Sequence, residues 1–189
     1  MTTKASLFVI SGPSGSGKSS LIAEVLKDLN SFEKSISATT RSMRKGEEDG
    51  IQYHFISKED FEKQIEDGSY LEWAEYSGYY YGTPKKFVDD RIEAGINVIL
   101  EIEVQGAMQV KESSTPAYYI FIVTTTTGEL RRRLIKRGTD NNEEIEKRMV
   151  IAEEELEYKK HYDCIIVNNN YNEALQNLKD VLNGTVGRK

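Results

Sequence analysis

A short glycine-rich segment limits the possible folds of this chain more than any other feature. Gly12–Ser19 reads GPSGSGKS and matches the pattern G-x-x-x-x-G-K-[ST], in which backbone N–H groups curl around phosphate oxygens. The pattern requires a strand before it and a helix after it. The apolar run at residues 6–10 precedes it, and Leu21, Ile22 and Val25 follow at helical spacing. A glycine turn that happens to precede a helix is the alternative, but this context favours a phosphate-binding loop (P-loop).

The loop predicts which residues hold a nucleoside triphosphate. The helix N-terminus adds the positive end of its dipole, and Lys18 supplies a mobile charge for the β- and γ-phosphates. The Ser19 hydroxyl can ligate Mg²⁺, the metal cofactor that we expect. The predicted triphosphate-binding residues are Gly12, Pro13, Ser14, Gly15, Ser16, Gly17, Lys18, Ser19 and Ser20.

The rest of the chain predicts an α/β fold. Helical patterns separate further short apolar runs, at residues 97–102, 118–123 and 164–167. Buried strands that alternate with helices indicate a parallel sheet covered on both faces, so we expect a three-layer P-loop domain with a central parallel sheet. Thr126 and Glu129 have the spacing of a capping box, which predicts a helix from about Leu130.

Residues 35–83 follow a different pattern. Their segments are short and strand-like, with turn signals between them and a brief helical pattern at residues 58–66. This region predicts a small mixed α+β insertion. The 189 residues fit a single domain, with its core at about 1–34, 84–126 and 160–189, the insertion at about 35–83 and a helical lid at about 127–159.

Composition excludes several classes of function. The chain has 31 acidic and 25 basic residues and a net charge of -6, which argues against binding to nucleic-acid polymers. A single cysteine rules out an internal disulfide framework and a cysteine-based metal site. The apolar run after Lys4 is too short for an export signal or a membrane span. We therefore expect a cytoplasmic protein with no membrane partner.

Two carboxylates lie at the end of the apolar run that begins at residue 97. Glu101 and Glu103 are two residues apart, so both would project to the same side of a strand. Because the run is otherwise apolar, they indicate a site that organises a metal beside Ser19, with Glu101 reaching Mg²⁺ directly or through water. A solvated strand end is the alternative.

A basic segment opens the insertion. Residues 34–46 contain no acidic residue and four basic ones, Lys34, Arg41, Arg44 and Lys45. Arg41 and Arg44 can clamp one anion from two directions, although a solvated basic turn would have the same composition. Five of the 11 tyrosines lie within residues 70–81. We expect most of the insertion's tyrosines to pack, and only Tyr53 and Tyr81 to contact a ligand.

Three further motifs are specific in combination with the P-loop: SATTR at Ser37–Arg41, LEWA at Leu71–Ala74 and YYGTP at Tyr80–Pro84. With these motifs the chain resembles the guanylate kinase family from about Leu7 to Leu182. The resemblance implies a P-loop nucleoside monophosphate kinase. Such an enzyme transfers the γ-phosphoryl group of MgATP to GMP, and to dGMP, and releases ADP and the nucleoside diphosphate.

The resemblance also implies roles for residues outside the loop. Those that match residues holding the acceptor phosphate are Arg41, Arg44, Tyr53 and Tyr81. Those that match residues reading the guanine are Ser37, Glu72, Thr83 and Glu103. Those that match catalytic arginines closing over the transferring phosphoryl group are Arg133, Arg137 and Arg148, which would act with Lys18. Asn168 matches a position near the adenine of ATP.

Hydrogen-bond chemistry supports guanine as the base. Guanine presents two adjacent donors, N1–H and N2–H₂, and the Glu72 carboxylate can accept from both, whereas adenine has an acceptor at N1. Glu103 stands where the family usually has aspartate, so the sequence is compatible with a direct contact to guanine or with one through water.

The sequence leaves two other functions open. A guanylate-kinase-like interaction module would keep the fold without catalysis, but the intact P-loop counts against it. An enzyme with another phosphorylated acceptor would keep the P-loop, but Glu72 and Ser37 disfavour it. We assign Arg131 and Arg132 to salt-bridged solvent faces and Trp73 to the core.

Overall fold

The central sheet has five parallel strands. The computed structural model describes residues 5–76, 78–138 and 141–185, except for the side chain of Arg137. The strands, in their order across the sheet, are β2 (Phe32–Lys34), β7 (Asn97–Glu101), β1 (Leu7–Ser11), β8 (Tyr118–Val123) and β9 (Cys164–Val167). Every pair of neighbours is parallel, which confirms the predicted sheet.

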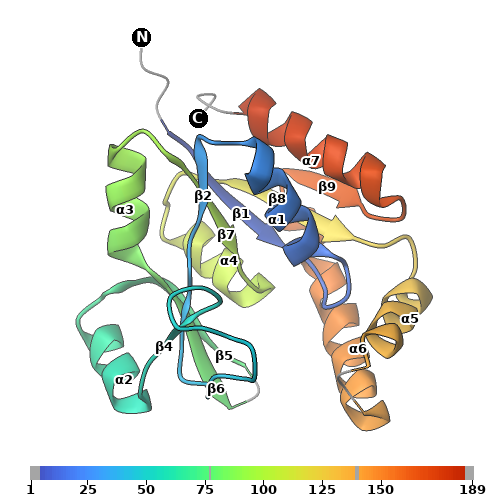
Figure 1. The fold of residues 1–189 in the computed structure, drawn as a ribbon, viewed down its shortest axis with the longest axis horizontal. Coiled ribbons are helices and arrows are strands. Elements are labelled where there is room, and N and C mark those ends of the chain that lie inside the picture. The colour runs from blue at the N-terminus through green and yellow to red at the C-terminus, as the bar shows by residue number, and fades with distance from the viewer. Residues whose placement is uncertain (1–4, 77, 139–140, 186–189) are drawn as a thin grey trace.

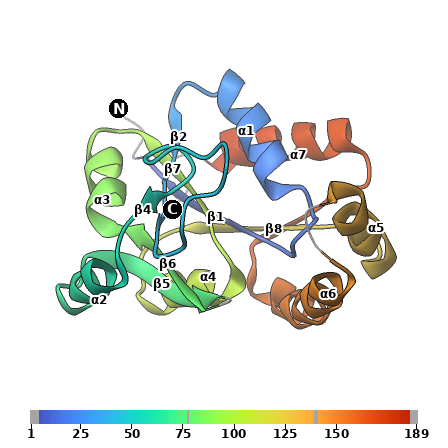
Figure 2. The same ribbon diagram turned by 60° about the horizontal axis from the view of Figure 1, so that its bottom comes forward.

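Helices cover both faces of this sheet. Along β1, Leu7 and Val9 point to one face, whereas Phe8 and Ile10 point to the other, because side chains alternate along a strand. The first face packs against α3 (Lys85–Glu93) and α4 (Val104–Glu112). The second packs against α1 (Lys18–Asp28) and α7 (Tyr171–Thr185). Figure 2 shows α1 and α7 above the sheet and α4 below it, so the predicted three layers are confirmed.

A smaller mixed sheet lies at the bottom left of Figure 1, far from α7. Its strands, in order, are β4 (His54–Phe55), β3 (Ala38–Thr39), β6 (Tyr79–Pro84) and β5 (Tyr70–Tyr76). β3 and β4 are parallel, and the other pairs are antiparallel. The helix α2 (Lys58–Glu66) spans the residues expected from the sequence and begins at the Ser57 side chain, which accepts a hydrogen bond from the Asp60 backbone.

The small sheet has its own aromatic contacts. The ring of Phe61, on α2, is fully buried and stacks on Tyr70 at 4.4 Å. Trp73 lies on the edge strand β5, meets Tyr80 edge-on at 5.7 Å and remains 37% exposed. The expectation that Trp73 is a core residue is therefore wrong, because an edge strand leaves one side of a large ring uncovered.

The last region pairs the helices α5 (Thr127–Arg137) and α6 (Asn142–Glu157). They share a small apolar core of Leu130, Leu134, Ile145, Met149 and Ala152. Thr126 does cap α5, since its side chain accepts from the Glu129 backbone, but the helix begins at Thr127, directly after the cap. A 3-10 turn, η1 (Tyr158–His161), leads from α6 toward β9. In the described ranges, no helix combines the length and apolarity needed to cross a membrane.

Candidate functional site

The glycine-rich loop joins β1 to α1, as the motif requires. Two of its glycines are needed for close approach. Gly12 has φ +142°, and a Cβ there would overlap the Ile122 carbonyl group. Gly17 has φ +92°, and a Cβ there would overlap the side-chain amide of Asn168. Only glycine combines these conformations with so little space, so the glycines allow the tight curl that a phosphate-binding loop requires.

Lys18 begins α1 with its side chain folded into the loop. The residue is 9% exposed, and its ammonium group donates to the carbonyl oxygen of Gly12 and, at 3.4 Å, to that of Pro13. The positive charge is thus held inside the loop that would surround phosphates. A short rotation of this flexible side chain would exchange the two carbonyl oxygens for phosphate oxygens.

The two residues proposed for the metal lie in direct contact. The Ser19 hydroxyl donates to Oε1 of Glu101, and Lys34 forms an ion pair with Oε2 of Glu101 at 2.5 Å. Burial alone would raise the pKa of Glu101, but Lys34, Ser19 and Lys18 together lower it, so the carboxylate stays ionised. A hydroxyl and a carboxylate are hard oxygen donors, which fits Mg²⁺.

Two of the three predicted catalytic arginines reach the P-loop. Arg133 donates to the carbonyl oxygen of Asn168 at 2.7 Å and to that of Ser16 at 3.4 Å, while Glu129 holds its other side at 2.7 Å. Arg148, on α6, donates to the Ser14 hydroxyl at 2.9 Å. Arg137 is the last residue of α5, and its side chain lies outside the described part of the chain.

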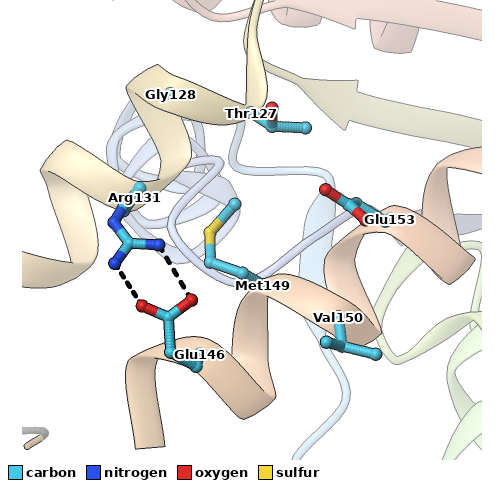
Figure 3. Close-up of a pocket in the computed structure, with 7 residues that line it drawn as sticks. All are labelled: Thr127, Gly128, Arg131, Glu146, Met149, Val150 and Glu153. Atoms are coloured by element: carbon cyan, nitrogen blue, oxygen red, sulfur yellow. Dashed lines mark hydrogen bonds and ion pairs between the residues drawn. The ribbon is translucent and has the colours of Figure 1, made fainter. Parts of the chain in front are cut away.

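The neighbouring arginines are held on the surface. Figure 3 shows Arg131 of α5 paired with Glu146 of α6 across a cavity of about 370 Å³ between the two helices. Arg132 pairs with Glu129, three residues earlier on α5. Both residues are exposed, so the assignment of Arg131 and Arg132 to salt-bridged solvent faces is confirmed.

Asn168 lies against the P-loop. It is 3% exposed, and its side-chain amide donates to the Ser16 carbonyl oxygen at 2.7 Å. Its own backbone carbonyl accepts from Arg133. Asn168 therefore connects the end of β9 to both the loop and α5, in addition to the position near adenine that the resemblance implies.

The residues expected to hold the acceptor phosphate gather at one end of the small sheet. Arg41 is 8% exposed, forms two hydrogen bonds with Glu47 at 2.8 and 3.0 Å, and lies over the Tyr53 ring at 5.5 Å. The rings of Tyr53 and Tyr81 meet at 5.7 Å. Arg44 is exposed, and its backbone N–H donates to Glu47 at 2.8 Å.

The positive charge of Arg41 is balanced by the carboxylate of Glu47. The hydrogen bond from Arg41, followed by that from the Arg44 backbone, lowers the pKa of Glu47. Burial, followed by the neighbouring Tyr81 and Glu101, raises the pKa of Tyr53 to about 12, so its hydroxyl stays protonated and can donate. A buried guanidinium beside the protonated Tyr53 hydroxyl suits the recognition of an anion.

Three of the four residues expected to read guanine lie in or beside the small sheet, whereas the fourth, Glu103, directly precedes α4. Glu72 on β5 is opposite Thr83 on β6, and the Thr83 hydroxyl donates to Oε1 of Glu72 at 2.5 Å. Ala38 is opposite Gly82 in the antiparallel pair of β3 and β6, so the next step in register brings Ser37 beside Thr83. The Glu72 and Thr83 side chains therefore lie on one face, and the chain just before β3 brings Ser37 close to them.

The Glu72 carboxyl group is 5% exposed. Burial raises its pKa to about 7, although the hydrogen bonds from Thr83 oppose this shift. A carboxylate can accept about four hydrogen bonds, so Glu72 has capacity for donors beyond Thr83, and adjacent donors on a planar base would use it.

Glu103 lies between the two halves of the site. It caps the start of α4, and its carboxyl group is in hydrogen-bonding contact with Glu155 on α6. Burial, followed by the charge of Glu103, raises the pKa of Glu155 to about 8, while Lys18 opposes this shift. Glu103 also acts electrostatically on Glu72 and Tyr53. Glu101 and Glu103 thus have different partners, Glu101 on the P-loop side and Glu103 on the α6 side.

The sequence did not reveal three neighbours of the site. Glu155 lies within an acidic run that resembles a solvated helix face. It follows Arg148 by seven residues, about two helical turns, and this spacing could have indicated that both lie on the same side of α6. Lys34 forms an ion pair with Glu101, and Glu47 forms one with Arg41. Such tertiary ion pairs leave no pattern in a single sequence.

Comparisons with known proteins agree with this geometry. The family model described as guanylate kinase matches residues 4–185. A guanylate kinase of Desulfitobacterium hafniense (strain Y51) is 48% identical over 176 residues, which cover 93% of this chain and 88% of that protein. One from Listeria innocua is 46% identical over 183 residues, which cover 96% and 89%.

A solved structure is similar over nearly the whole chain. The crystal structure of guanylate kinase from Anaplasma phagocytophilum superposes with a TM-score of 0.81 and 29% sequence identity, covering 98% of this chain and 88% of that one. Guanylate kinases are nucleoside monophosphate kinases that generally use a divalent metal with ATP. The chain therefore belongs to the guanylate kinase family, whose members phosphorylate GMP at the expense of ATP.

Proposed function

We propose that this chain transfers the γ-phosphoryl group of MgATP to GMP and to dGMP through the residues described above. The observation that carries the proposal is the buried Glu72 carboxyl group, held by Thr83 on a sheet beside the P-loop region. A guanine base would satisfy it with N1–H and N2–H₂. A base without these donors would leave it unpaired, at a cost in binding.

The acceptor phosphate would bind where Arg41, Tyr53 and Tyr81 gather, with Arg44 closing from the surface. The Arg41 guanidinium group lies over the Tyr53 ring and donates to both carboxylate oxygens of Glu47, which orients it. Its present partner Glu47 keeps the charge in place. The anionic phosphate oxygen of GMP is itself the nucleophile, so this chain needs no strong general base.

The donor triphosphate would bind the backbone N–H groups of the P-loop, with Lys18 on its β- and γ-phosphates. An oxygen of the GMP phosphate forms a bond to the γ-phosphorus as the bond to the β–γ bridging oxygen breaks, giving ADP and GDP. Arg133 and Arg148, which contact Ser16 and Ser14, are within reach of the charge on the transferring group. We extend the same role to Arg137.

Mg²⁺ is the divalent ion that we propose, because Ser19 and Glu101 supply oxygen donors. Ser19 would ligate the ion directly, and Glu101 would hold it directly or through water. Bound Mg²⁺ would neutralise charge on the β- and γ-phosphates. Lys34 keeps the Glu101 carboxylate ionised and oriented on Ser19.

We also propose a division of labour along the chain: residues 35–83 hold the acceptor, residues 127–159 form a lid, and the rest is the P-loop core. Closure of the first two over the core would exclude water from the transferring group. A cytoplasmic location, expected from the sequence, is part of the same proposal.

One assay tests this function. ADP release from MgATP is measured with GMP, dGMP, AMP, CMP and UMP as acceptors. We expect turnover with GMP and dGMP, and kcat/KM values at least about 100-fold lower with the other three. No turnover with any acceptor would support an interaction module. A preference for another acceptor would mean that Glu72 has a different role.

A further inference from the structure

Helix α4 packs against β5, the strand that carries Glu72. The helix is itself fixed on the central sheet, because Val104, Ala107 and Val110 are buried in its core. β5 is an edge strand of the small sheet, so one side of its backbone is available to a neighbour other than a strand. The position of β5 relative to the core therefore depends on what α4 presents to it.

Gly106 is the point of closest approach. It is buried in the middle of α4, where glycine is a poor helix former. A Cβ at this position would lie 2.8 Å from Cδ of Glu72 and closer still to Oε2. The carboxylate of Glu72 thus occupies the space that any other residue would fill. Its other oxygen, Oε1, is held by Thr83.

Gln109 is the second contact, three residues further along α4. Its side-chain oxygen accepts from the Trp73 backbone N–H at 3.1 Å, and its side-chain nitrogen donates to the Trp73 carbonyl oxygen at 2.7 Å. A single glutamine therefore pairs with the edge of β5 as a neighbouring strand would. Because Trp73 directly follows Glu72, this pairing fixes the backbone that carries the carboxylate.

We propose that α4 sets the position of the base-reading carboxylate, with Gly106 leaving the space for Glu72 and Gln109 fixing its strand. The inference rests on the proposed function and names two positioning residues for its base selectivity. Neither residue needs to touch the base. The central sheet and the base site are thereby joined through one helix.

The steric part is tested without any nucleotide. Gly106→Ala and Glu72→Asp are combined in a double-mutant cycle, and urea unfolding is measured for the full chain. We expect Gly106→Ala to destabilise the protein that has Glu72. In a protein that already carries Glu72→Asp, whose side chain is one methylene shorter, Gly106→Ala should lower the free energy of unfolding much less. If Gly106→Ala lowers the free energy of unfolding equally in the protein with Glu72 and in the Glu72→Asp protein, the inference is wrong.

The selectivity part is tested by kinetics. Gly106→Ala should raise the KM for GMP by about tenfold or more, because a charged hydrogen-bonding group has moved, while the KM for ATP changes less than about twofold. The preference for GMP over inosine monophosphate, which lacks the N2 amino group, should shrink. Gly184→Ala is the control, since it lies in helix α7 with open space around its Cβ position.

Gln109 has a matched control on the same helix. Gln109→Met keeps the side-chain length and removes both hydrogen bonds, whereas Gln105→Met makes the same change at an exposed position one turn earlier. We expect the KM for GMP to rise about three- to tenfold only in the first variant. An equal rise in the KM for GMP in both variants would contradict a positioning role for Gln109. Unchanged GMP kinetics in a folded Gly106→Ala protein would contradict one for Gly106. If wild-type protein fails to use GMP, the unfolding cycle still decides the steric claim.

Discussion

At the scale of single residues, Lys18 is the charge on which phosphoryl transfer depends most. Lys18 is buried, and its ammonium group contacts loop carbonyl oxygens, so its charge acts in an environment less screened than bulk water. Lys18→Ala should lower kcat by about 100-fold or more. Steady-state ADP release measures this, and Lys27→Ala, at an exposed position on α1, is the control that should stay near wild type. A near-normal kcat without Lys18 would contradict the assignment.

Glu72 makes GMP binding depend on pH. Its pKa of about 7 lies above the ordinary range, so the folded protein holds this proton more tightly than the unfolded chain does. As pH rises from 6 to 8 the group loses its proton and becomes the acceptor that guanine needs. The KM for GMP should therefore fall by about tenfold over this range, if only this group titrates.

The GMP phosphate also titrates near pH 6, so the measurement needs a reference. Glu72→Gln provides it, because the amide has no proton to lose while the phosphate behaves as before. The ratio of the two KM values, wild type to variant, should fall from pH 6 to 8. A constant ratio would show that Glu72 is already ionised at pH 6.

At the scale of elements, the sequence predicted most of the architecture because four of the five strands of the central sheet are short apolar runs. The fifth, β2, has Glu33 and Lys34 beside Phe32 and was not predicted. The run at residues 164–167 and the helix at residues 58–66 appear in the structure with the predicted bounds. Trp73 was misjudged since apolarity alone does not distinguish a core strand from an edge strand. Glu155 and Gly106 were missed, because their roles arise from segments that meet only after folding.

Helices α5 and α6 carry arginines in two different environments. Arg148 reaches Ser14 of the P-loop, whereas Arg131 pairs with Glu146 on the exposed side of the two helices. Arg148→Ala should lower kcat by about 100-fold, because it removes a positive charge near the transferring group. Arg131→Ala should change kcat less than about twofold, since exposed ion pairs contribute little. Equal losses measured by ADP release would contradict this division.

At the scale of the whole molecule, phosphoryl transfer shielded from water requires the small sheet and the α5–α6 pair to approach each other when both nucleotides bind. Small-angle scattering should show the radius of gyration falling toward ~16 Å, the value for a compact chain of 189 residues, with GMP plus a non-hydrolysable ATP analogue. Either nucleotide alone should lower the radius of gyration by a smaller amount. An unchanged radius with both would mean that the chain binds them without closure.

The distribution of charge, rather than its total, explains how an acidic molecule binds two polyanions. The net charge of -6 coexists with Lys18, Arg41 and Arg148 beside the site, while Glu72, Glu101 and Glu103 each have a local partner or task. The sequence could predict the members of this arrangement from motifs. Their pairing, such as Glu101 with Lys34, required the fold.

Guanine selection by Glu72 and ATP binding by the P-loop are, on this proposal, separate functions. Glu72→Gln tests this separation most directly, with KM and kcat measured for both substrates. We predict a kcat/KM for GMP at least about 100-fold below wild type, because the amide can accept only one of the two guanine donors and places its own N–H₂ against the other. The KM for ATP should change less than about threefold. Equal changes in the kinetics of GMP and ATP would contradict the claim.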